Sequence, residues 1–276
     1  LYSIDIAEQS LDQCVKLMSE ATFLYIVSDG STYKNKGTYG VIYCTPAGRR
    51  LIKLGGQVYG YKISSFRVEL YGRLAAGRLL INLKKFYGLR ETTLSNLKFY
   101  TDSQSSIIKI TEYAKFQKYY PNTTLAPDWD VIQAIVSSDL QLNNKNNTGH
   151  IKAHQDQQTE YRKLPLIAQL NCDADEYATT MYIKVKDWKK QFSPIEGCNC
   201  YVMYQGNPIT SRLKQRTRKI HNNDPLVKQL RKKTTGTKSC STQLTGKVFE
   251  KEQINITRKK HSLQNWCTKY FRQVTE

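Results

Sequence analysis

The sequence predicts an α/β fold, in which a five-stranded mixed sheet is flanked by helices and followed by a basic C-terminal extension. Three strand-like segments joined by short turns are typical of an antiparallel meander. Helical and strand-like segments then alternate, which is typical of a sheet covered by helices. Later in the chain the regular pattern weakens and basic residues accumulate. The predicted units are a linker or helix from an upstream region at residues 1–21, the α/β domain at 22–188, and the extension at 189–276.

The first half of the domain carries the meander and a long helix. Residues 1–20 have apolar side chains at weakly helical spacing, which predicts a helix. A second helix is expected to begin after Ser64, a suitable N-cap, and to end near Gly88. The predicted meander strands are residues 23–29, 38–44 and 50–58, with turns at Lys36-Gly37 and Pro46-Ala47-Gly48.

The second half of the domain alternates helices with strands. Asp128 is expected to cap one of these helices, because Asp is a favoured N-cap residue. The predicted elements are a strand at residues 97–102, a helix at about 103–117, a loop at Pro121–Pro127, a helix to about 141, a polar linker at Asn143–Asn147, a strand at 149–153, a Gln-rich loop at 155–165 and a helix at Asn171–Trp188.

The composition excludes several classes of protein. The 276 residues are 39% apolar, and no apolar run approaches the roughly 20 residues that cross a bilayer. No secretory signal is present, and the chain begins with Leu1 rather than Met, which favours a piece of a longer polypeptide. The seven cysteines are scattered, so reduced thiols in the nucleus or cytoplasm are expected. A zinc site at Cys198-Asn-Cys200 is the less favoured alternative, because no second Cys/His pair lies at a suitable spacing.

The basic residues are concentrated in one part of the chain. Residues 181–276 hold 21 Lys and Arg against 6 acidic residues, a net charge of +15, whereas residues 1–180 hold 21 against 17. A charge run is often only a solvated surface, but this density favours a polyanionic partner. We therefore expect the extension to bind nucleic-acid phosphates.

Four acidic residues lie where predicted elements begin or end. Asp29 follows the apolar run Phe23–Val27, Asp102 ends the strand at 97–102, and Glu69 lies early in a helix. Asp175 begins the last helical pattern, and His154 lies in the loop before it. If the fold brings these carboxylates together, they form a cage for two divalent metals, as used in phosphodiester hydrolysis. Mg²⁺ prefers such oxygen ligands.

Each of these residues also has an ordinary structural interpretation. Asp29-Gly30-Ser31 is a common turn sequence, and Glu69 could pair with Arg73 one helical turn later. Asp102 could cap a helix, and Asp175 could be a first-turn acid. Their joint order and placement favour the metal site over four separate coincidences.

The sequence around these residues resembles type 1 ribonuclease H. The similarity covers residues 22–186 and is closest to the ribonuclease H domain that follows the polymerase in eukaryotic retroelement polyproteins. The motifs that carry it are Tyr-Ile-Val-Ser-Asp29-Gly-Ser, Phe-Arg-Val-Glu69-Leu, Tyr-Thr-Asp102-Ser-Gln, Ile-Lys-Ala-His154-Gln and Asn-Cys-Asp-Ala-Asp175-Glu.

The resemblance implies an enzyme that hydrolyses the RNA strand of RNA–DNA hybrids with two Mg²⁺ ions, for which Mn²⁺ substitutes. Asp29 would bridge the metals, Asp175 would complete the water-activating site, and Glu69 with Asp102 would hold the metal near the leaving 3′ oxygen. His154 would assist proton transfer or product release. A reverse transcriptase would be linked upstream. The implied substrate-binding residues are Gly30, Ser31, Ser103 and Gln104, with backbone amides at Gly30–Ser31 near the RNA minor groove.

Two departures from the family pattern leave alternatives open. The gap from His154 to Asp175 is longer than in compact cellular enzymes, and Asp173 competes for the fourth ligand position. Ala174 and Ala178 favour Asp175, because small residues let that helix pack closely on the sheet. A degenerate, inactive retroelement domain that only binds nucleic acid is one alternative function, and another nuclease or integrase of the same fold is a second.

Overall fold

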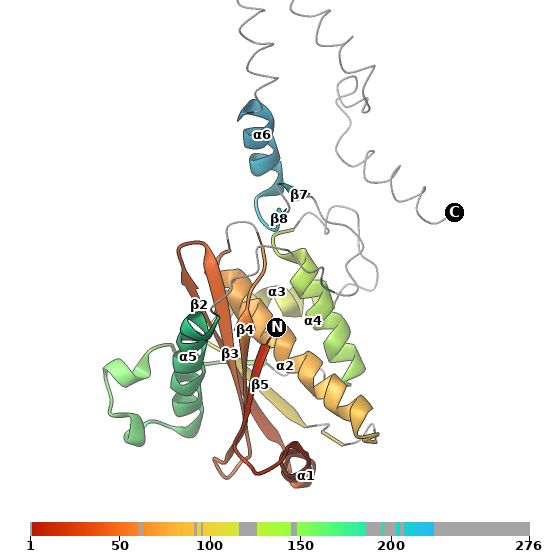
Figure 1. The fold of residues 1–276 in the computed structure, drawn as a ribbon, viewed down its shortest axis with the longest axis vertical. Coiled ribbons are helices and arrows are strands. Elements are labelled where there is room, and N and C mark those ends of the chain that lie inside the picture. Colours follow the sequence, from red (N-terminus) through yellow and green to blue (C-terminus); the bar gives the residue numbers. More distant parts are fainter. Residues whose placement is uncertain are drawn as a thin grey trace, which may run out of the picture. The chain divides into compact units, whose positions relative to one another are not determined.

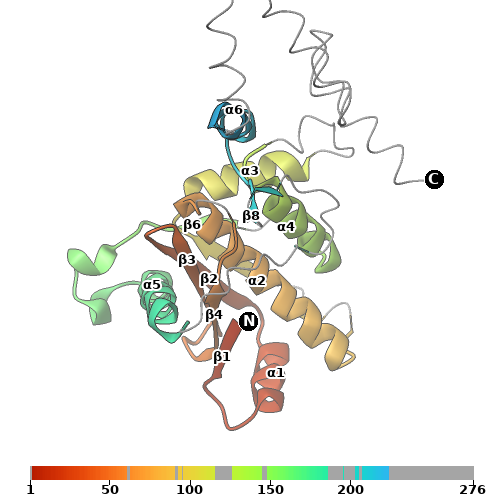
Figure 2. The ribbon, with the colours of Figure 1, turned by 45° about the horizontal axis from the view of Figure 1, so that its top comes forward.

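The computed structural model describes residues 2–60, 63–90, 93–94, 96–115, 126–144, 148–185, 195, 203–204 and 207–223 (Figures 1 and 2). The chain divides into two compact units. The larger holds residues 1–117 and 128–210, and the smaller holds 118–127 and 211–276. Within the described residues of the smaller unit, the basic cluster at 212–219 begins at Arg212 and continues through helix α6, Leu213–Asn223. The clusters at 228–233 and 258–260, most of the loop at 121–127, and the pair Cys198 and Cys200 fall outside the described residues.

A mixed sheet forms the centre of the larger unit, and its described part has six strands rather than the five predicted. The spatial order is β1-β4-β3-β2-β5-β6. β2, β5 and β6 run parallel to one another, and the remaining neighbours are antiparallel. The strands are β1 (Tyr2–Ile6), β2 (Leu24–Tyr33), β3 (Lys36–Cys44), β4 (Arg50–Gln57), β5 (Leu97–Thr101) and β6 (Thr148–His150). A separate two-stranded sheet joins β7 (Met203–Tyr204) to β8 (Asn207–Pro208).

The additional strand is β1, so the helix predicted over residues 1–20 is wrong for residues 2–6. Ile4 and Ile6 recur with a period of two and alternate with polar residues, which is the spacing of a strand. β1 pairs with β4 through contacts such as Ile4 with Leu54. The helix begins only at Leu11, where Ser10 caps α1 by accepting a hydrogen bond from the Gln13 amide.

Helices cover both faces of the sheet (Figure 1). α5 packs against β2 and β3 on one face, and α2 packs against the same strands on the other, with α4 against α2. Ser64 caps α2 as predicted, since its hydroxyl accepts from the Arg67 amide. The helices of this unit are α1 (Leu11–Glu20), α2 (Ser65–Phe86), α3 (Gln104–Ala114), α4 (Trp129–Gln141) and α5 (Leu166–Lys184).

Four predicted boundaries or caps differ from the structure. The strand predicted at 149–153 is β6, Thr148–His150, so residues 151–153 lie after the strand. β2 continues through Asp29 to Tyr33, because Lys34 and Asn35 both adopt positive φ and form the turn to β3. α5 begins at Leu166, so Asp175 lies within this helix rather than in its first turn. Asp128 precedes α4 but makes no side-chain capping bond, because its carboxylate bonds instead to Arg67.

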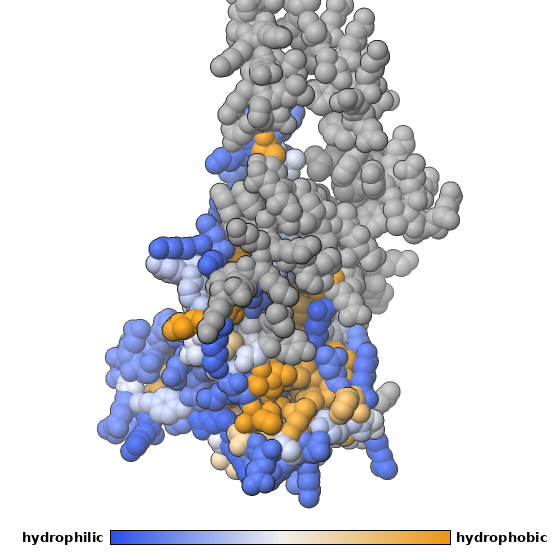
Figure 3. All heavy atoms as spheres, viewed as in Figure 1, coloured by the Kyte–Doolittle hydropathy of each residue, from blue (hydrophilic) through white to orange (hydrophobic). Residues whose placement is uncertain are grey.

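Most of the described surface visible in Figure 3 is hydrophilic, with apolar side chains gathered low on this face. Within the described ranges, no helix combines the length and apolarity that crossing a bilayer demands.

Candidate metal centre

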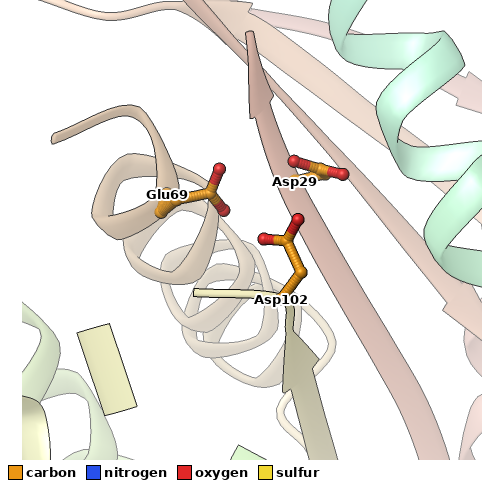
Figure 4. Close-up of side chains that lie close together, drawn as sticks. All are labelled: Asp29, Glu69 and Asp102. Carbon is orange, nitrogen blue, oxygen red and sulfur yellow. The ribbon is translucent and has the colours of Figure 1, made fainter. Parts of the chain in front are cut away.

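The two aspartates of neighbouring strands come together because β2 and β5 are parallel. Val27 lies opposite Tyr100 in this pair, so Asp29 and Asp102, each two residues further along, reach the same end and the same face of the sheet. β2 lies between β3 and β5, so Asp29 occupies the central strand that a metal-bridging residue requires. Glu69 enters from α2, and the three carboxylate groups face one another (Figure 4). One oxygen of each lies within 4.8 Å of the others.

Glu69 is fixed by both strands. Its Oε1 accepts from the Gly30 amide at 3.1 Å, and its Oε2 accepts from the Thr101 hydroxyl at 3.3 Å. Close approach of α2 requires glycine at position 30, because a Cβ there would lie 2.4 Å from Cγ2 of Val68. The pairing of Glu69 with Arg73 considered above does not occur, since Arg73 pairs with Asp139.

A buried ionic cluster holds the N-terminal end of α2. The fully buried Arg67 guanidinium donates to both oxygens of Asp130 at 2.9 and 2.7 Å, and to Asp128 at 3.0 Å. Its Nε donates to the Tyr59 carbonyl at 2.6 Å. Such a bidentate, desolvated pair is geometrically restrictive. Because Glu69 lies two residues after Arg67, the cluster also restricts where Glu69 can lie.

Asp175 lies on α5 beside this cluster of carboxylates. Ala174 and Ala178 contact Gly40 so closely that a Cβ at Gly40 would lie 2.3 Å from the Ala174 carbonyl oxygen. Gly40 is the cross-strand partner of Asp29, so α5 crosses the sheet at the level of Asp29. The negative charge of Asp175 raises the pKa of both Asp29 and Asp102, although burial is the larger cause at each.

Asp173, the competing fourth ligand, is engaged elsewhere. Its carboxylate accepts from Arg50 Nε at 2.9 Å and from the Tyr161 hydroxyl at 2.6 Å. Asp173 and Asp175 both lie outside the close group of Asp29, Glu69 and Asp102. Asp175 is distinguished by its charge, which adds to burial in raising the pKa of Asp29 and Asp102.

Two histidines lie near Asp102, of which the sequence motifs indicated one. His154 is exposed, adopts a positive φ of 50°, and lowers the pKa of Asp102 against the larger effect of burial. His150, at the end of β6, donates from Nε2 to the Asp102 carbonyl oxygen at 3.0 Å. The register of β5 with β6 places His150 opposite Thr101 and so beside the Asp102 backbone. That register comes from the structure, so the sequence motifs did not indicate His150.

The four predicted substrate-binding residues flank the carboxylates. Gly30 and Ser31 follow Asp29 in β2, and Ser103 and Gln104 follow Asp102 at the start of α3. The Gly30 amide donates to the Asp29 and Glu69 carboxylates, so it is already occupied within the protein. Ser31 is partly exposed and Gln104 is exposed.

The electrostatics of the cluster suit a divalent cation. Burial, together with the charges of Asp102 and Asp175, raises the pKa of Asp29 to about 7. Burial, followed by the charges of Asp29 and Asp102, raises the pKa of Glu69 well above its ordinary value. Like charges crowded in a desolvated site disfavour ionisation, and a metal ion reverses this effect. The residues therefore fit a hard, oxygen-ligated cation such as Mg²⁺.

We expect the metal-free protein to lose stability as pH rises from about 4 to about 7. In this range the folded state retains a proton on Asp29 that the unfolded chain releases, so each pH unit costs up to about 1.4 kcal/mol for this group. Urea unfolding in chelator at several pH values, compared between wild type and Asp29→Asn, isolates the effect. The stability advantage of Asp29→Asn should grow towards pH 7, and saturating Mg²⁺ should remove it. An advantage that does not change with pH would contradict the prediction.

The fold and the cluster together define an α/β domain with a carboxylate cage at the centre of its sheet. No protein-family profile and no curated protein matches the chain. Solved structures that it is similar to include ribonuclease H1 of Halobacterium salinarum NRC-1, with 13% identity and a TM-score of 0.37 over 58% of this chain and 98% of that one. A second is LC11 ribonuclease H1 in complex with an RNA/DNA hybrid, with 13% identity and a TM-score of 0.39 over 59% of this chain and 99% of that one.

A third similar structure is the foamy viral protease–reverse transcriptase in complex with double-stranded DNA. It shares 14% identity with a TM-score of 0.42, over 61% of this chain and 98% of that one. The printed names of these three structures are two ribonucleases H1 and a foamy viral protease–reverse transcriptase.

Proposed function

We propose that the chain is a type 1 ribonuclease H that hydrolyses the RNA strand of RNA–DNA hybrids and that it derives from a retroelement reverse transcriptase. The observation that supports this function is the group of Asp29, Glu69 and Asp102 at the centre of the sheet, with Asp175 beside it. Few structural roles require three carboxylates within 4.8 Å of one another, two of them buried, whereas two-metal phosphodiester hydrolysis uses such a group. The proposal that the substrate is an RNA–DNA hybrid rests on the resemblance of the sequence motifs to type 1 ribonuclease H.

Asp29, Glu69, Asp102 and Asp175 would hold two Mg²⁺ ions, with Mn²⁺ as a substitute. When bound, these ions supply charge stabilisation at the phosphate and activation of water. In this proposal Asp29, on the central strand, would hold both ions. Asp175 would complete the site that activates water, and Glu69 with Asp102 would hold the ion near the leaving 3′ oxygen. The hydrogen bonds from Gly30 and Thr101 orient Glu69 before metal arrives.

His154 would transfer a proton or assist product release, because it is exposed beside Asp102 and is not restrained among the ligands. Since the Gly30 amide already donates within the protein, the proposed contacts to the hybrid rest on Ser31, Ser103 and Gln104. The sugar 2′-hydroxyl in the minor groove is the group that distinguishes RNA from DNA there.

A cleavage assay on one sequence tests the function. It compares an RNA–DNA hybrid with double-stranded RNA and double-stranded DNA, each in Mg²⁺, in Mn²⁺ and in chelator. We expect metal-dependent cleavage of the RNA strand of the hybrid only. Binding of the hybrid without cleavage would instead favour the inactive nucleic-acid-binding alternative. Cleavage of double-stranded DNA would favour another nuclease of this fold.

The basic extension is proposed to bind the phosphates of the hybrid. To test this without disturbing the larger unit, the deletion should begin after Thr210 rather than near the predicted start of the extension. The Thr210 carbonyl accepts a hydrogen bond from the Asp128 amide, and Ile209 is buried. The deleted residues 211–276 carry 17 Lys and Arg against 4 acidic residues. The carboxylates of the metal centre all remain.

Deleting residues 211–276 should weaken hybrid binding and flatten its dependence on salt. Each phosphate neutralised releases counterions and contributes roughly −0.9 to the slope of log affinity against log salt for duplex DNA. Cleavage at low salt and saturating hybrid should survive the deletion. Binding titrations over a range of salt concentrations measure the slope, and an unchanged slope would mean that the extension is only a solvated segment.

A further inference from the structure

The loop between β6 and α5, residues 151–165, carries His154 and is largely exposed. Its regular structure consists of two short 3₁₀ turns, Gln155–Gln157 and Tyr161–Lys163. A histidine that works beside Asp102 must nevertheless return to one position in each turnover. What holds this loop therefore matters for the proposed chemistry.

One side chain of the loop is bonded to two charged residues from outside it. The Tyr161 hydroxyl donates to Asp173 Oδ1 at 2.6 Å and accepts from Arg50 Nη2 at 2.9 Å. Arg50, on β4, closes the triangle by donating from Nε to Asp173 Oδ2 at 2.9 Å. The hydroxyl thus joins the loop to a helix and a strand at a single point.

The arginine is itself held in place by further bonds. Arg50 Nη1 donates to the Gly48 carbonyl at 2.9 Å, and Nη2 also donates to Gln169 Oε1 at 3.2 Å. Gln169 in turn donates to the Leu164 carbonyl at the end of the loop at 2.9 Å. A guanidinium that uses Nε and both Nη atoms at once has little rotamer freedom.

The helix end of the triangle lies close to the metal centre in sequence. Asp173 precedes Asp175 by two residues on α5, and the helix is fixed to the sheet by the contact of Ala174 and Ala178 with Gly40. The loop is therefore tied to the same rigid segment that carries Asp175.

We propose that Arg50, Tyr161 and Asp173 form an anchor that positions the loop so that His154 acts on the substrate. Tyr161 is the positioning residue of this anchor, and the inference rests on the proposed ribonuclease H activity. The anchor explains why Asp173 is acidic although it is not placed among the metal-centre carboxylates. It also gives Arg50 a role at a site to which it contributes no ligand.

The test is a double-mutant cycle between Tyr161→Phe and His154→Ala, with cleavage of an RNA–DNA hybrid in Mg²⁺. Tyr161→Phe keeps the ring but removes both hydroxyl bonds, and should lower kcat about fivefold with KM unchanged. In the His154→Ala background it should change kcat less than about twofold, because the residue that it positions is gone. Arg50→Lys should behave like Tyr161→Phe, since an ammonium cannot make the forked contact.

Tyr87→Phe is the matched control. The Tyr87 hydroxyl also donates a hydrogen bond to an aspartate, Asp12. Tyr87 follows the end of α2 and Asp12 lies in α1, so this bond does not involve the loop at 151–165. It should leave kcat unchanged in both backgrounds. Equal losses of kcat from Tyr161→Phe with and without His154 would overturn the proposal and leave a purely structural bond.

A second measurement separates failure of the anchor from failure of the proposed function. Arg162 and Lys163 lie beside Tyr161, are exposed, and are trypsin sites. Tyr161→Phe should speed tryptic cleavage there severalfold, and Tyr87→Phe should not. If wild type cleaves no hybrid, the function fails. In that case unchanged proteolysis would refute the anchor as well, whereas accelerated proteolysis would retain it as a restraint on the loop.

Discussion

Replacing Asp29 with Asn should abolish the proposed hybrid cleavage while the fold is kept. The side-chain oxygen of the introduced asparagine can still accept the 2.6 Å hydrogen bond that the Gly30 amide donates to Asp29 Oδ1. The amide cannot supply the charge that the two proposed cations would share at this position. We expect a loss in kcat of about a thousandfold or more, equal to roughly 4 kcal/mol of transition-state stabilisation.

The fold of this variant should be at least as stable as wild type near pH 7 without metal. Asp29 has a pKa raised to about 7 by burial and by Asp102 and Asp175, and the substitution removes that unfavourable ionisation. Cleavage kinetics and urea unfolding are measured on the same preparation. Substantial Mg²⁺-dependent cleavage by Asp29→Asn would contradict the assignment of the site, whereas loss of both folding and cleavage would leave the role of Asp29 to be tested with Asp102→Asn.

Asp175→Asn should lower kcat by about a hundredfold or more, whereas Asp173→Asn should cost less than about tenfold. Both residues lie on α5 and both are changed from Asp to Asn, so each variant is a control for the other. Asp175 acts electrostatically on Asp29 and Asp102. Asp173 instead pairs with Arg50 and Tyr161.

The two variants should also differ in stability. Asp173→Asn weakens a partly exposed ion pair, which is worth up to about 1 kcal/mol. Asp175→Asn removes a repulsive charge and should not destabilise the metal-free protein. Single-turnover cleavage and denaturant unfolding of both variants measure these effects. A reversed ranking of the two rates would mean that Asp173, not Asp175, completes the site.

The sequence was sufficient for the parts of the fold that local patterns encode. Short strand-like apolar segments and the turn residues between them predicted β2 to β5, and Ser64 predicted the start of α2. The sequence indicated Asp29 and Asp102 as candidates that would form a site if the fold brought them together. The parallel pairing of β2 with β5, which does bring them together, comes from the structure.

Long-range side-chain partners could not be predicted in this way. Arg67 and Asp130 are 63 positions apart, and Arg50 and Asp173 are 123 apart. Nothing in the local sequence of either partner identifies the other, so Asp128 was expected to cap α4. The five-residue β1 was missed because its short alternating pattern continues into a helical one. Only the pairing of residues 2–6 with β4 shows that they form a strand and not the start of the helix.

β1 also determines how the domain can be isolated. It covers the outer edge of β4 along residues 52–56, and Asp5 on β1 accepts from the Tyr177 hydroxyl of α5 at 2.8 Å. A version that starts at residue 22 would leave the amides and carbonyls of β4 without these partners. In the full chain β1 is itself the edge strand, but it has only five residues and carries the charged Asp5, whereas β4 would present an eight-residue edge. Longer uncovered strand edges recruit other chains more readily, so such a version should self-associate. Light scattering of chains that begin at residues 1 and 22 would reveal this, and the first five residues of the sheet would then be a barrier against aggregation.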